Sequence, residues 1–120
     1  DQFTRNAYRG TPASFAGDAR ALAAARRVVS LGWDGGYTPV QRWFCYLPFE
    51  HSESLADQRE SLRLFATLRD DPVAGGAYDW AVKHFEIVER FGRFPHRNEI
   101  LGRASTAEEI EFLRQPGSRF

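Results

Sequence analysis

Cysteine is nearly absent from this chain of 120 residues, and its scarcity excludes two kinds of covalent or metal-based support. Cys45 is the only cysteine, so neither an internal disulfide nor a four-thiolate zinc site can form. Its neighbours, from Trp43 to Leu47, are largely apolar and predict a buried, reduced and inert thiol.

Long apolar segments and methionine are also missing. No run approaches the ~20 apolar residues that a membrane-spanning helix needs, and no signal-peptide pattern is present. We therefore expect a cytoplasmic protein with no membrane partner. Because methionine is absent and Asp1 carries no helix-start signal, we also expect further residues to precede this segment in the native polypeptide.

Net charge is absent as well, because 16 basic residues balance 16 acidic ones. Proteins that hold a polyanion usually concentrate positive charge over the whole domain, so we expect no nucleic-acid partner. Lys83 is the only lysine, and every other basic residue is arginine. The planar guanidinium of arginine suits bidentate and partly buried ion pairs.

The chain lacks the alternation of apolar and polar residues that marks β-strands, whereas helix signals recur along it. Threonine followed by proline, which is typical of a helix start, occurs at Thr11 and again at Thr38. We expect a single all-α domain over residues 1–120, with about five or six helices packed as antiparallel hairpins. The main helices are predicted at residues 12–31, 39–47, 53–70, 77–91 and 105–113.

Particular residues set these predicted boundaries. Pro48 is expected to break the second helix, and Gly92 is expected to adopt a left-handed cap after the fourth. Ser105 and Glu108 match a capping box for the last helix. Two pairs spaced by four residues, Glu86–Arg90 and Glu89–Arg93, are expected to form weak ion pairs on the helix surface.

The stretch from Phe91 to Arg103 is the most distinctive part of the chain. It carries three arginines, a histidine and an asparagine among apolar residues, in the order FGRFPHRNEILGR. Such a density of hydrogen-bond donors indicates either a segment that joins helices from inside or an anion-binding surface.

Four segments together resemble a widespread family of unknown activity, domain of unknown function 924. They are DQFTRNAYRG at 1–10, YLPFEHSESLADQ at 46–58, HFEIVERFGRFPHRNEILGR at 84–103 and STAEEIEFL at 105–113. The resemblance implies an all-helical, tetratricopeptide-repeat-like fold. It also implies that relatives carry further helices ahead of Asp1, so we expect this chain to be the C-terminal part of the family's usual domain.

Three residues are the candidates for proton-transfer chemistry, namely His51, Glu53 and His84. A structural role competes in each case. His51 lies at a corner before a helix whose start Ser52 or Ser54 can cap, and Glu53 suits the positive end of that helix. His84 lies near the edge of a predicted buried stripe, where histidine commonly donates to a backbone carbonyl.

Five residues are the candidates for binding an anion: Arg93, His96, Arg97, Asn98 and Arg103. Their side chains can equally satisfy the carbonyl groups of a buried loop, and we favour that role for Arg93, Arg97 and Asn98. The three histidines lack the spacing of known metal-binding motifs, so we expect no metal site and no cofactor.

Two functions follow from these patterns. The first is a helical scaffold or interaction domain that binds a peptide segment or another protein, or forms a homo-oligomer. The alternative is an enzyme or small-anion-binding protein in which arginines hold an anionic group, His51 or His84 moves a proton, and Glu53 orients the histidine.

Overall fold

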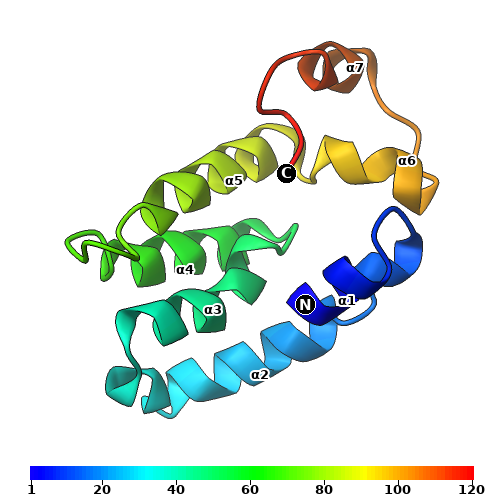
Figure 1. The fold of residues 1–120 in the computed structure, drawn as a ribbon. Helices are drawn as coiled ribbons and strands as arrows, with labels where there is room; N and C mark the ends of the chain where they lie inside the picture. Colours follow the sequence, from blue (N-terminus) through cyan, green and yellow to red (C-terminus); the bar gives the residue numbers. More distant parts are fainter.

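The computed structural model describes residues 1–120 and confirms the all-α prediction (Figure 1). Seven α-helices and three short 3-10 helices are present, and there is no β-strand. The α-helices are α1 (Gln2–Ala7), α2 (Asp18–Ser30), α3 (Pro39–Glu50), α4 (Leu55–Ala66), α5 (Ala77–Phe91), α6 (Asn98–Leu101) and α7 (Ala107–Leu113). The 3-10 helices are η1 (Pro12–Phe15), η2 (Trp33–Gly36) and η3 (Pro95–Arg97).

The four longest helices stack in chain order, from α2 to α5, each running opposite to the one before (Figure 1). Helix α4 lies between α3 and α5 and packs against both. The main core is built from the inner faces of these helices and of the turn before α5. Its buried members are Ala25, Tyr46, Leu47, Phe49, Leu64, Phe65, Leu68, Ala74, Ala77 and Ala81.

The two threonine–proline starts behave differently. Thr38 forms the predicted helix start, because its hydroxyl accepts the Gln41 N–H while the Gln41 side chain accepts the Thr38 N–H. At Thr11 the hydroxyl donates to the Tyr8 carbonyl instead, at 2.7 Å. The single helix predicted over 12–31 is therefore wrong in detail, since a 3-10 turn precedes α2 and Gly17 separates the two.

Pro48 does not break α3 as predicted. The helix continues to Glu50, and the His51 N–H still donates to the Leu47 carbonyl at 2.9 Å. A proline removes one helical hydrogen bond. Here residues 46–50 are all buried, so tertiary packing holds the last turn in place. Helix α4 is also shorter than predicted, because Ser54 caps its start and turns replace its last residues.

Helix α5 has the predicted bounds, and Gly92 follows it with a φ of 73°. Beyond it, η3, α6 and α7 surround a small second core of Ile87, Val88 and Phe94. The capping box of α7 is formed by Thr106 and Glu109, one residue later than the Ser105–Glu108 pair that the sequence suggested. Both pairs fit the sequence pattern, and the burial of Glu109 (2% exposed) decides between them.

Glu109 is the centre of a polar network that joins this second core to the preceding loop. Its carboxylate accepts two hydrogen bonds from Arg93, at 2.7 and 2.9 Å, and one from Asn98 at 3.3 Å. These contacts, with Arg93 as the largest cause, lower the pKa of Glu109 to about 2. Arg103 continues the network, since it donates to the Asn98 side chain and binds both carboxylate oxygens of Glu53.

The two ion pairs predicted from the spacing of four residues, Glu86–Arg90 and Glu89–Arg93, are replaced by pairs to α7. Arg90 binds Glu108 at 2.9 Å, and Arg93 binds Glu109 rather than Glu89. A buried carboxylate that accepts several hydrogen bonds, as Glu109 does, contributes more stabilising free energy than an exposed ion pair on one helix, which contributes only ~0.2–0.5 kcal/mol. Tertiary contacts therefore override the local spacing.

No helix of the structure combines the length and the apolar character that crossing a bilayer demands.

We predict that Glu109→Gln lowers the free energy of unfolding by about 2 kcal/mol, because it removes the charge that Arg93 and Asn98 share. The matched control is Glu108→Gln, which alters an exposed pair and is expected to cost less than ~0.5 kcal/mol. Urea denaturation of the two variants measures the difference. Equal stabilities for both variants would contradict a central role for Glu109.

Candidate functional site

A cavity of about 360 Å³ brings together four of the residues singled out from the sequence. His51, His84, His96 and Arg97 all line it, although they come from the end of α3, from α5 and from η3. Helix α1 and η1 form the opposite wall. The cavity therefore forms where both ends of the chain meet α3 and α5.

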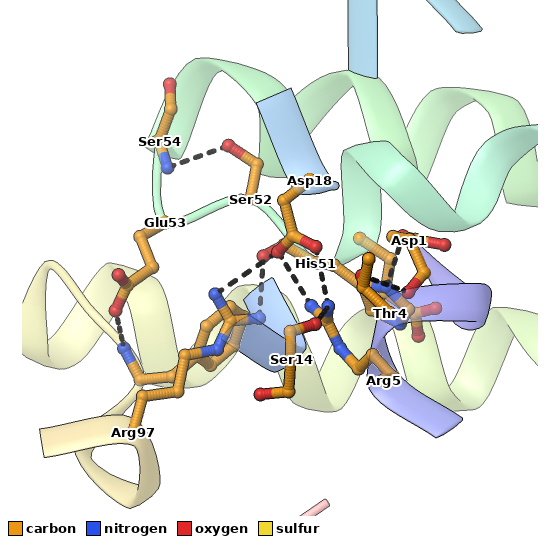
Figure 2. A network of polar contacts seen from close by, with 12 residues as sticks. Asp1, Thr4, Arg5, Ser14, Asp18, His51, Ser52, Glu53, Ser54 and Arg97 are labelled. Atoms are coloured by element: carbon orange, nitrogen blue, oxygen red, sulfur yellow. Dashed lines mark hydrogen bonds and ion pairs between the residues drawn. The ribbon is translucent and has the colours of Figure 1, made fainter. Parts of the chain in front are cut away.

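His51 is held by a carboxylate fifty residues away in the sequence. Its Nδ1 lies 2.6 Å from Oδ2 of Asp1, and Figure 2 shows this contact beside Arg5 and Thr4. Because the carboxylate can only accept, Nδ1 carries the hydrogen, and Nε2 is left without a protein partner. Burial and then the charge of Arg5 lower the pKa of His51 to about 3, so its ring is neutral at pH 7.

His84 is oriented in a similar way from within α5. Its Nδ1 donates to the Trp80 carbonyl at 2.7 Å and lies 3.1 Å from Oε1 of the buried Glu50. The ring stacks on Phe120, with centroids 3.9 Å apart, and meets the edge of Phe94. These contacts fix the ring plane, and Nε2 is again the nitrogen without a protein partner.

His96 lies beside these rings but is less constrained. Its Nδ1 is buried and has no hydrogen-bond partner in the protein. Burial, followed by the charge of Arg97, lowers the pKa of His96 to about 4. A second neutral imidazole therefore faces the cavity at pH 7.

Arg97 is the buried cation of the site, with 7% of its surface exposed. Its guanidinium lies over the rings of Phe15 and Phe94, at 4.7 and 4.6 Å, and donates to the His51 carbonyl at 2.8 Å. Burial and then Arg5 lower its pKa to about 10, which leaves it charged at pH 7. Its Nε has no partner, and its carboxylate neighbour Asp18 is 3.9 Å away.

Asp18 is already engaged by a second arginine. Arg5 binds both of its oxygens, at 2.5 and 2.8 Å, and donates to the Ser14 carbonyl (Figure 2). Two guanidinium groups therefore share one carboxylate. Arg9 also lines the cavity and forms no ion pair or side-chain hydrogen bond.

The charges are arranged in two layers around the cavity. Three arginines line it, and no carboxylate does. The acidic groups stand behind this wall, with Asp18 against Arg5, Asp1 against His51 and Glu50 against His84. A ligand in the cavity thus meets guanidinium groups directly and the carboxylates only at longer range.

The other candidates from the sequence lie outside this cavity. Arg93, Asn98 and Arg103 belong to the network around Glu109, where each makes side-chain hydrogen bonds. Glu53 binds Arg103 and accepts the Phe94 N–H at 2.6 Å, and it lines a separate cavity of about 220 Å³ on the other side of Arg97. It forms no hydrogen bond or ion pair with His51 or His84, and Asp1 and Glu50 take the orienting position proposed for it.

Sequence reasoning missed Arg5, Arg9, Asp18 and the two carboxylates behind the histidines. Arg5 and Arg9 stand four residues apart in the segment DQFTRNAYRG, a spacing that would place both on one face if the segment were helical throughout, although α1 ends at Ala7. That spacing was the one available signal. Asp1, Asp18 and Glu50 carry no local pattern, because their partners come from distant parts of the chain.

Histidine, cysteine and carboxylate side chains do not gather into any group of three or more that could hold a metal ion.

One solved structure gives a close comparison, that of a protein of unknown function, ATU0120, from Agrobacterium tumefaciens. The two are 42% identical, the TM-score is 0.83, and the match covers 94% of this chain and 61% of the other. The chain thus spans less than two thirds of the length of that relative. No curated protein matches the chain.

A family-level comparison agrees with the resemblance seen in the four sequence segments. The family described as bacterial protein of unknown function (DUF924) matches residues 1–117, nearly the whole chain. The chain belongs to the DUF924 family of bacterial proteins of unknown function.

Proposed function

We propose that the cavity between α1, η1, α5 and η3 binds a small anion. The observation that carries this proposal is Arg97, a buried guanidinium on the cavity wall whose carboxylate neighbour Asp18 lies 3.9 Å away and is shared with Arg5. A buried charge normally finds a hydrogen-bonded counter-charge. A phosphate or carboxylate group that meets this guanidinium in the cavity supplies one.

Unsatisfied buried polar atoms gather at this site. Five side chains in the protein have such an atom, and two of them, His96 and Arg97, line the cavity. A third, Glu50, lies directly behind His84. Buried polar groups rarely remain without partners, so this clustering marks a region whose polar groups the protein itself does not fully satisfy.

The size and lining of the cavity limit the ligand. About 360 Å³ accommodates a small organic molecule, and its walls include Phe15, Ile100 and Phe120. Asp1, Asp18 and Glu50 stand close behind the cationic wall and reduce its net field. We therefore expect modest affinity for a bare inorganic ion and tighter binding for an anion with a small carbon body.

A phosphate titration followed by NMR tests this proposal. We expect Arg97→Ala to weaken phosphate binding by roughly tenfold or more, because a hydrogen bond to a charged group is worth about 1.5–3 kcal/mol. Arg97 also supports the His51 carbonyl, so a folding-neutral variant is needed. Arg9→Ala supplies it, since Arg9 is exposed and unpaired, and we expect an affinity loss of about two- to fivefold.

Arg114→Ala is the matched control, because Arg114 is exposed and lies outside the cavity. It should leave phosphate binding unchanged. Wild-type protein whose cavity resonances do not respond to phosphate, or equal losses in Arg9→Ala and Arg114→Ala, would contradict the proposal.

The histidines give a second prediction, concerning pH. Both His51 and His96 have folded-state pKa values below the ordinary value of 6.5, at about 3 and about 4. Their ring resonances in NMR should stay constant between pH 5.5 and 8, whereas in urea they should titrate near 6.5. The folded form therefore prefers neutral rings, so this contribution to stability is full above pH 6.5 and is lost as the pH falls towards 3. Titration of either folded ring near pH 6.5 would contradict the burial argument.

A second candidate function is contact with a protein or peptide, in keeping with a tetratricopeptide-like arrangement or a homo-oligomer. The observation in its favour is a set of exposed large apolar side chains, among them Phe3 at 79%, Val73 at 70% and Phe44 at 60%. Sedimentation velocity over a hundredfold range of concentration tests self-association. A constant monomer mass would remove the homo-oligomer from consideration.

A further inference from the structure

We propose that the anion bound in this cavity also carries hydroxyl groups, because His51 and His84 each turn an unpartnered Nε2 acceptor towards it. The inference rests on the proposed anion site and specifies its ligand as a hydroxylated phosphate or carboxylate. It follows from how Asp1 and Trp80 hold the two imidazole rings.

The hydrogen positions on both rings are determined by their partners. A carboxylate oxygen of Asp1 and the carbonyl oxygen of Trp80 can only accept, so Nδ1 of each histidine must donate. A neutral imidazole carries one N–H, and Nε2 is then an acceptor. Both residues line the cavity, and neither Nε2 is among the buried atoms without partners, so both are open to a ligand.

The two rings are close enough to serve one ligand. Their centroids are 6.1 Å apart, a separation that one small molecule with adjacent hydroxyl groups can bridge. Arg97 lies beside them and donates to the carbonyl of His51 itself. The cavity wall thus presents donors for an anionic group next to acceptors for hydroxyl groups.

Burial, followed by the charges of Arg5 and Arg97, keeps His51 in the neutral, accepting form despite the nearby carboxylates. The charged groups that face the two rings are Asp1 and Glu50 behind them and Arg5 and Arg97 beside them. With a pKa of about 3, His51 is a poor base at neutral pH, whereas efficient general bases have pKa values near the working pH. It is nevertheless a constant acceptor, which favours recognition of a hydroxyl over removal of its proton.

Matched pairs of probes test the inference directly. We expect sn-glycerol 3-phosphate to bind roughly three- to tenfold more tightly than n-propyl phosphate, and lactate more tightly than propionate, by calorimetry at pH 7.5. Within each pair the anionic group and the number of carbon atoms are the same. The difference therefore reports hydroxyl recognition alone.

Two variants then assign that difference to the histidines. His84→Phe keeps an aromatic ring against Phe120, and His51→Phe removes the other acceptor, so each should reduce the preference for the hydroxylated probe. The readout is the ratio of the affinities for sn-glycerol 3-phosphate and n-propyl phosphate in each variant, so that a general loss of anion binding does not mimic a loss of hydroxyl recognition. Circular dichroism tests whether the variants fold. If either does not, the affinities of the wild-type protein for the paired probes still decide whether hydroxyl groups are recognised.

The outcomes separate the two proposals. Equal affinity for both members of each pair would overturn the hydroxyl inference and leave the anion site intact. A preference that persists in both histidine variants would overturn the assignment to His51 and His84. No binding of any of the four probes would overturn both proposals.

Discussion

The contacts of the buried Arg97 guanidinium are the interaction on which the packing of this protein depends most. Its guanidinium lies between Phe15 from η1 and Phe94 from the loop after α5, donates to the His51 carbonyl at the end of α3, and faces Asp18 at the start of α2. One side chain thus contacts the beginning, the middle and the end of the chain. Aromatic faces and a carbonyl reduce the cost of burying its charge, but they do not neutralise it. Because the buried charge of Arg97 is not neutralised, the same side chain that packs the fold also gives the cavity its positive charge.

The segment FGRFPHRNEILGR divides its polar residues between two tasks. Arg93, Asn98 and Arg103 join α7 and the loop to the start of α4 through Glu109 and Glu53. Arg97 and His96 turn towards the cavity instead. The first three residues therefore have the structural role weighed from the sequence, whereas Arg97 and His96 line the cavity for which anion binding is proposed. The stabilising network holds η3 in place, and η3 in turn positions the residues of the site.

The fold class and the best-defined helix could be predicted because they depend on local signals. Apolar residues at helical spacing and Gly92 define α5 completely, and they need no information from elsewhere. The errors arose where distant contacts outweigh local ones. Pro48 stays within α3 because its neighbours are buried, and α7 is capped one residue later than expected because Glu109 has partners in Arg93 and Asn98.

The residues of the candidate site could likewise be predicted from the sequence only in part. The sequence by itself determined that the chain is helical, that it has three histidines and that an arginine-rich segment follows the helix at residues 77–91. Only the tertiary structure decided that His51, His84, His96 and Arg97 share a cavity, and that Asp1 and Glu50 orient two of the rings. The reason is physical. Helix formation depends on contacts within a few residues, whereas the pairing of Asp1 with His51 spans fifty residues and exists only once the stack has folded.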